Sequence, residues 1–83
     1  MIYNINLGKW NSVFAVPSEF VDKYIVPSNE AQIKVFLWIL RHSGQKLSLS
    51  EIANALGLTQ EEVKNSVVYW QERDLISMPL SEE

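Results

Sequence analysis

The stretch that decides the fold is SEIANALGLTQEEVKNSVVYWQERDLI, residues 50–76. Apolar residues recur at helical spacing on both sides of Gly57, which can take the left-handed backbone conformation that ends a helix. We expect Ser50 to cap the first helix and Thr59 the second, because each hydroxyl can accept a free backbone N–H. Glu62 follows Thr59 by three residues and completes a capping box. The stretch therefore predicts a helix-turn-helix.

Composition restricts the class of protein. The chain has 83 residues, enough for one small domain, and its 47% hydrophobic and 20% charged residues are typical of a globular protein. The formal net charge is −3, whereas a dedicated binder of duplex DNA usually has a basic surface. The absence of cysteine excludes disulfides and thiolate metal sites.

Targeting signals are also missing from the sequence. The longest apolar run, residues 35–40, is far shorter than the ~20 residues that a membrane-spanning helix needs. No basic stretch precedes an apolar segment at the N-terminus, as it does in a signal peptide. We therefore expect a cytoplasmic protein without membrane contact.

The first sixteen residues predict an extended β arm. Apolar and polar residues alternate over residues 2–7, residues 8–11 suit a turn, and residues 13–16 are a second β-prone run. Two strands are marginal alone, so they must pack on the chain's own core or pair with another subunit. The side chains expected at a subunit interface are Tyr3, Ile5, Leu7, Trp10 and Phe14.

Two further helices are predicted before the helix-turn-helix. The first begins at Pro17 and ends at Val26, and its inner face comprises Phe20, Tyr24, Val21 and Ile25. The second covers residues 28–43, where the polar residues form one narrow stripe and apolar residues occupy nearly every other position. Such a helix is central to the fold or contacts a second apolar surface.

Short β-prone runs at residues 46–49 and 75–78 complete the pattern. With the helices, they predict a mainly α fold with a small β component, a winged helix-turn-helix carrying an extended N-terminal β arm. The expected divisions are the arm at 1–16, the winged-helix domain at 17–78 and a tail at 79–83.

The outer face of the second motif helix decides between DNA and protein as its partner. Val63, Val67 and Trp70 share one side, which predicts that they enter the core. The partner-facing side chains are Gln60, Glu61, Lys64, Asn65, Val68 and Glu72. Four acids and two bases lie between residues 59 and 74, a balance that opposes contact with phosphates. The face therefore favours a protein partner.

The alternative hypothesis is a sequence-specific DNA-binding transcriptional regulator that uses Lys46, Gln60, Lys64 and Asn65. An enzyme is not expected, because there is no Gly-rich phosphate loop, no Ser-His-acid arrangement and no His pair at metal-ligand spacing. The lone His42 suits a helix cap. No cofactor or metal is expected either.

Three segments carry a family resemblance: IYNINLGKWNSVFAVPSEFVDKYI at 2–25, QIKVFLWILRHSG at 32–44, and the quoted stretch at 50–76. Together they resemble the N-terminal domain of DnaD-like bacterial replication-initiation proteins. The resemblance covers nearly all of residues 1–78. The arm followed by FLWILRHSG is more distinctive than the helix-turn-helix, which many regulators share.

The resemblance implies a winged-helix domain whose N-terminal elements form a homodimer or homotetramer. It also implies a role in primosome assembly, with replication-initiation or helicase-loading proteins as partners. In that family most DNA binding resides in a separate C-terminal domain, so DNA contact is expected to be weak or to depend on a domain absent from these residues.

Overall fold

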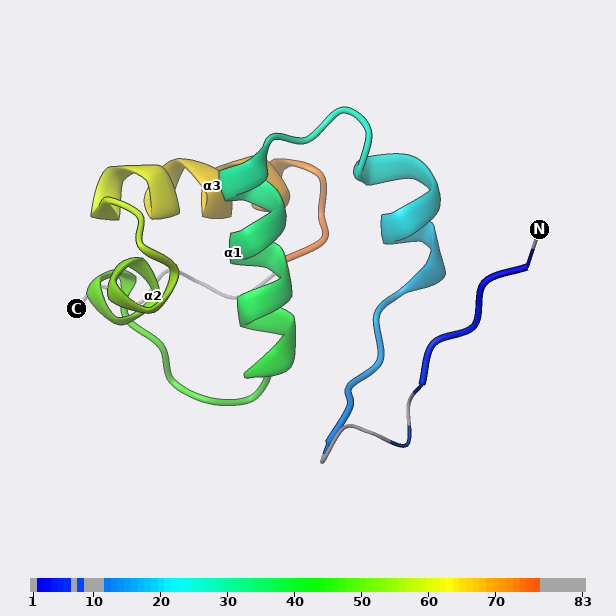
Figure 1. Cartoon of the computed structure of the whole chain (residues 1–83). Coiled ribbons are helices and arrows are strands. Elements are labelled where there is room, and N and C mark those ends of the chain that lie inside the picture. The colour runs from blue at the N-terminus through cyan, green and yellow to red at the C-terminus, as the bar shows by residue number, and fades with distance from the viewer. Residues whose placement is uncertain (1, 7, 9–11, 77–83) are drawn as a thin grey trace.

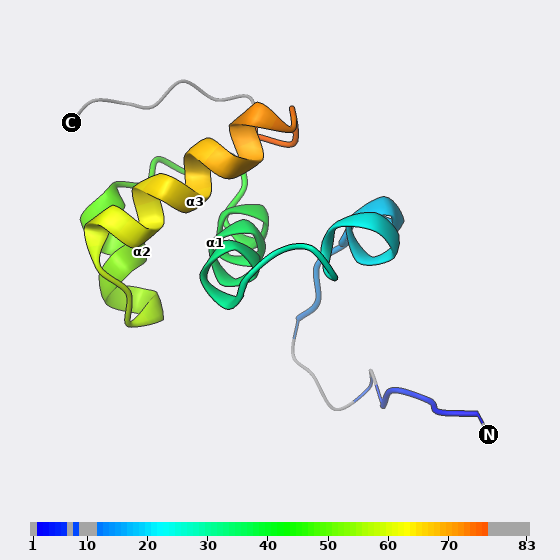
Figure 2. The same ribbon diagram turned by 90° about the horizontal axis from the view of Figure 1, so that it is seen from above.

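The computed structural model describes residues 2–6, 8 and 12–76. Its elements are a π-helix, η2 (Phe20–Tyr24), and three α-helices, α1 (Glu30–Arg41), α2 (Leu49–Leu56) and α3 (Gln60–Glu72). Helix α1 stands in the middle of the molecule, and α2 and η2 lie on opposite sides of it (Figures 1 and 2). The prediction of a mainly helical fold is confirmed.

The predicted capping box of α3 is present. The Thr59 hydroxyl accepts the Glu62 N–H at 3.0 Å, and the Glu62 carboxylate accepts the Thr59 N–H at 2.9 Å. Gly57 has a φ of 73° and ends α2, as expected. The turn and the start of α3 therefore form for the local reasons that the sequence indicated.

The predicted cap of α2 was wrong by two residues. Ser48, not Ser50, precedes the helix, and its hydroxyl accepts the Glu51 N–H at 3.1 Å. The Glu51 carboxylate in return accepts the Ser48 N–H. Ser50 could not form this reciprocal pair, because Ala53 occupies the position three residues after it.

Two buried clusters hold the helices together, and α1 contributes to both. The first contains Val35 of α1 with residues of α2 and α3; the second contains Phe36 of α1 with Phe20 of η2, Trp70 of α3 and Ile76. The broad apolar surface predicted for this helix is explained by these two contacts. Helix α1 is shorter than the predicted 28–43, because Asn29 and His42 cap its ends.

The inward side of α3 is confirmed. Val63, Val67 and Trp70 are all buried, and Val63 and Trp70 have no exposed surface. Trp70 also donates its indole N–H to the backbone carbonyl oxygen of Gln32 at 2.8 Å. This bond gives the one polar atom of a fully buried indole its partner and joins α3 to the first turn of α1.

The predicted strands are absent from the described residues, and this is a correction to the β arm and the wing. Residues 46–48 form a loop and Leu49 already belongs to α2. The Leu75 N–H donates to the Trp70 carbonyl oxygen at 3.0 Å. This bond closes the end of α3, so the N–H does not pair with a β-strand. In the arm, residues 2–6 and 12–16 have no neighbouring strand to pair with. Residues 77 and 78 of the predicted wing lie outside the described residues.

The first predicted helix is reduced to η2, with a helical turn at residues 18 and 19 before it. Phe20 is buried and Tyr24 is half-buried, as expected for an inner face. Val21 and Ile25 are exposed, so their placement on that face was wrong. Val21 is 51% exposed and Ile25 is 38% exposed, so both side chains lie partly in solvent.

Candidate interaction surfaces

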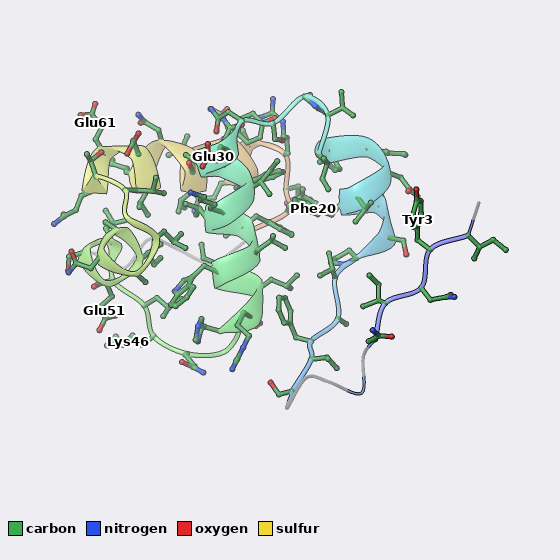
Figure 3. All side chains as sticks on the ribbon, in the orientation of Figure 1. Tyr3, Phe20, Glu30, Lys46, Glu51 and Glu61 are labelled. Carbon is green, nitrogen blue, oxygen red and sulfur yellow. The ribbon has the colours of Figure 1, made fainter. Side chains whose placement is uncertain are left out.

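The described residues of the arm, 2–6, 8 and 12–16, present apolar side chains to solvent. Ile2, Tyr3 and Ile5 are 86%, 82% and 73% exposed, and Phe14 is also exposed. Figure 3 shows Tyr3 on the arm, whereas Phe20 turns from η2 towards α1. Of the predicted interface residues, Leu7 and Trp10 lie outside the described residues. Tyr3, Ile5 and Phe14 thus have the exposure that an interface requires, and none of them is used in the core.

Exposed apolar side chains are concentrated at one end of the chain. The described residues include eleven large apolar side chains that are exposed, and nine of these precede residue 27. The nine are Ile2, Tyr3, Ile5, Val13, Phe14, Val16, Val21, Ile25 and Val26; the other two are Val68 and Leu75. Contiguous apolar patches are typical of interaction sites, whereas scattered apolar residues on a surface need no explanation.

Three of these residues form a surface that sequence reasoning missed, here called the η2 outer face: Val21, Ile25 and Val26. Val26 is 91% exposed although it is β-branched and apolar. The wheel positions of Val21 and Ile25 were the signal that could have identified it. The Pro27 that follows was a second signal, since it prevents the helix from continuing past Val26.

The inner side of η2 packs against α1 and α3. The Phe20 ring stacks on Phe36 with centroids 4.3 Å apart, and it lies 5.5 Å from the Trp70 ring. After η2, the Ser28 hydroxyl is hydrogen-bonded to the Tyr24 carbonyl oxygen and lies 3.1 Å from the Tyr69 hydroxyl. Contacts at both ends therefore fix residues 20–28 to α1 and α3.

The outer face of α3 also lies in solvent. All six predicted residues on it are exposed: Gln60, Glu61, Lys64, Asn65, Val68 and Glu72. Lys64 makes no ion pair within the described chain. Glu62 is not available for a partner in the same way, because its carboxylate caps α3. Figure 3 shows Glu61 at the end of α3 that lies near α2. The predicted α3 residues thus share one exposed face, and acidic side chains outnumber basic ones on it.

One ionisable group in the described chain has a shifted pKa. The Lys34 ammonium lies 2.8 Å from the Glu30 carboxylate, and its hydrogen bond and charge lower the pKa of that carboxyl below the ordinary value. The lowered pKa stabilises the folded state at pH values above the ordinary pKa of the carboxyl. This contribution is lost as the pH falls through the pKa of the folded state. The group is fully exposed, so the contribution is small.

Neither surface contains a candidate metal site in the part of the chain that the structure describes. No group of three or more His, Cys, Asp or Glu side chains that could hold a metal ion occurs among these residues. Within the same residues, no helix is long and apolar enough to cross a membrane.

Comparison of the chain with protein-family models, with curated proteins and with solved structures finds no match.

Proposed function

We propose that the chain is an oligomerisation and protein-interaction domain of a DnaD-like replication-initiation protein, cytoplasmic and active in primosome assembly. The observation that carries the proposal is the arm, which presents Tyr3, Ile5 and Phe14 outside the core. A monomer would leave this apolar surface in water, whereas a homodimer or homotetramer would bury it.

The proposal assigns the predicted β structure of the arm to the assembled protein. An isolated two-stranded ribbon is marginal in water, but a strand gains its backbone hydrogen bonds when it pairs with another chain. In such a pair, the alternation of apolar and polar residues over 2–7 places one set of side chains against the partner. The winged-helix relationship rests on the capped α2–turn–α3 unit, and the wing itself remains part of the proposal.

The second element of the proposal is a protein partner on the outer face of α3. Glu61 and Glu72 lie on either side of Lys64 along this helix, and Val68 is an exposed apolar side chain among them. Phosphates would be repelled by these carboxylates, whereas a protein with basic side chains would be attracted. A replication-initiation or helicase-loading protein is the kind of partner that the resemblance implies.

Light scattering of the purified chain tests the oligomerisation. At roughly tens of micromolar we expect a dimer or larger assembly, because mass action favours association at that concentration. The double variant Tyr3→Ser/Ile5→Ser should shift the mass towards the monomer. Val68→Ser, which changes an apolar side chain on α3, is the matched control and should leave the mass unchanged. A wild-type chain that stays monomeric throughout would contradict the proposal.

A DNA-binding regulator is the second candidate, and one observation favours it. Gln60, Lys64 and Asn65 are all exposed within the first two turns of α3, where a recognition helix contacts base edges. Titration with duplex DNA at two salt concentrations separates the candidates. Tight binding that weakens steeply with salt and is abolished by Lys64→Glu would support the regulator; weak binding would support the oligomerisation domain.

A further inference from the structure

We propose that the C-terminal end of α1 and the loop that leads to α2 bind an acidic segment of a partner protein. The surface, here called the α1 end surface, consists of Trp38, Arg41, His42 and Lys46. It contains no residue of the arm, of η2 or of α3. The inference therefore goes beyond the proposed function and does not depend on oligomerisation.

The first argument is the distribution of charge along the chain. Residues 31–50 contain three lysine or arginine residues and no acidic residue, although the formal net charge of the whole chain is −3. The acidic residues on either side of this segment are both engaged: the Glu30 carboxylate pairs with Lys34, and the Glu51 carboxylate accepts the Ser48 N–H. The segment is therefore a basic region of an acidic chain.

The second argument is that the cations of this surface have no carboxylate partner. Lys23 and Lys34 are held in ion pairs. Arg41 and Lys46 are exposed and make no ion pair with any described residue. The helix dipole favours a cation in the last turn of α1, where Arg41 lies. Lys46 lies in the loop beyond that turn, so the dipole gives no reason for its charge.

The third argument is the aromatic pair beside these cations. The centroids of the Trp38 and His42 rings lie 4.3 Å apart, and both residues are half-buried. Trp38 packs against the first buried cluster, so the core fixes its position. Because residues three and four apart are neighbours on a helix, Arg41 and His42 both lie next to Trp38. Tryptophan and arginine are enriched where proteins bind proteins, so this combination favours a protein as the occupant.

The loop that carries Lys46 has a defined backbone. The Gln45 N–H donates at 3.1 Å to the carbonyl oxygen of the residue that caps α1, and Gly44 between them has a φ of 88°. Glycine adopts this left-handed conformation without strain, so the turn is formed before a partner binds. In Figure 3 Lys46 lies at the end of the molecule away from Glu61. Glu51 lies at the same end as Lys46, but its carboxylate caps α2.

The permanent cations of the α1 end surface, Arg41 and Lys46, suit the carboxylates of a protein segment better than a nucleic acid. Affinity for a nucleic acid grows with the number of phosphates that are neutralised, and so few cations give little binding at physiological salt. The planar guanidinium of Arg41 can hold one carboxylate through two parallel hydrogen bonds, and Lys46 can pair with a second carboxylate. An apolar side chain of the same segment would contact Trp38.

Titration of the isotope-labelled, full 83-residue chain with the acidic peptide EDELDE tests the inference by NMR. We expect shift changes at residues 38–46 and at the Trp38 indole N–H, and binding that weakens as salt is added. The amide counterpart QNQLNQ should cause no such changes. Lys46→Glu should weaken the binding of EDELDE roughly tenfold, because it replaces an attraction with a repulsion. Lys46 is exposed, so the variant keeps the fold, which circular dichroism checks.

The matched control is Lys64→Glu, which makes the same change of net charge on α3 and should leave the affinity for EDELDE nearly unchanged. Equal weakening by Lys46→Glu and Lys64→Glu would mean that only net charge matters, and it would overturn the inference. Shift changes that are absent, or that fall outside residues 38–46, overturn it as well. Tighter binding of a DNA oligonucleotide to residues 38–46 would assign the surface to a nucleic acid instead.

The titration also separates this inference from the proposed function. A wild-type chain that stays monomeric in light scattering overturns the proposed function but leaves the binding of EDELDE in place. An assembly of unchanged mass that gives no shift changes with EDELDE overturns the inference alone.

Discussion

Asp74 follows the end of α3 in a left-handed conformation, with a φ of 62°. Its N–H bonds to the Gln71 carbonyl oxygen, and the next N–H, from Leu75, returns to the Trp70 carbonyl oxygen. Glycine normally occupies such a position, as Gly57 does at the end of α2 with a φ of 73°. A side chain in this conformation costs roughly 1–2 kcal/mol, although Asp tolerates it better than most residues.

Substitution of Asp74 should therefore separate backbone strain from charge. Asp74→Gly and Asp74→Ala both remove the carboxylate, but only glycine relieves the left-handed strain. We expect Asp74→Gly to exceed Asp74→Ala in free energy of unfolding by about 1 kcal/mol in urea denaturation. Equal stabilities would show that residue 74 leaves this conformation in solution.

At the scale of elements, each of the three α-helices begins with a capping box: Asn29 with Gln32, Ser48 with Glu51, and Thr59 with Glu62. Side chains three residues apart thus satisfy two backbone N–H groups at each start. Helix α2 depends most on this arrangement, because it has only eight residues, and isolated helices of that length are unstable in water.

The cap of α2 gives a prediction with a built-in control. Ser48→Ala should lower the free energy of unfolding by ~1 kcal/mol, because the Glu51 N–H loses its acceptor. Ser50→Ala makes the same chemical change two residues further on. It removes an exposed hydroxyl that lies 3.3 Å from the Ser48 hydroxyl but leaves the acceptor of the Glu51 N–H in place, so it should alter the free energy of unfolding by only a few tenths of a kcal/mol. Thermal or urea unfolding of both variants measures the difference. A larger loss of stability for Ser50→Ala would show that Ser50, and not Ser48, caps α2.

The helices were predictable because their sequence signals are local. The strands were not, because a strand forms only with a pairing partner elsewhere. Thr59, Glu62 and Gly57 determine backbone geometry within a few residues, so the turn and the start of α3 followed from the sequence. The strands failed because alternation identifies a chain that can pair, and pairing requires a second strand. The α3 face was found by its period, whereas the η2 outer face was missed because η2 has only five residues.

At the scale of the whole molecule, the second cluster joins the two ends of the chain. Phe20 packs on Trp70, fifty positions later, and Ile76 completes the same cluster. Ser28 and Tyr69 make a second long-range contact beside it. Helix η2 is therefore held in place by its contacts with α1 and α3.

Removal of the Phe20 ring should test this attachment. Phe20→Ala is expected to lower the free energy of unfolding by about 3–5 kcal/mol, because a buried ring leaves a cavity between Phe36 and Trp70. Phe14→Ala deletes an exposed ring from the arm and should cost well under half as much. Denaturation at a concentration where the chain is monomeric makes the comparison. Similar losses for the two variants would mean that η2 is not anchored through Phe20.

The long-range anchoring of Phe20 has a consequence for the order of events during synthesis. Phe20 is translated well before Trp70 and Ile76, against which its ring packs. The Phe20 ring of a growing chain thus lacks its α3 contact until Trp70 has been made. Burial of this ring is therefore completed only after translation has passed Ile76.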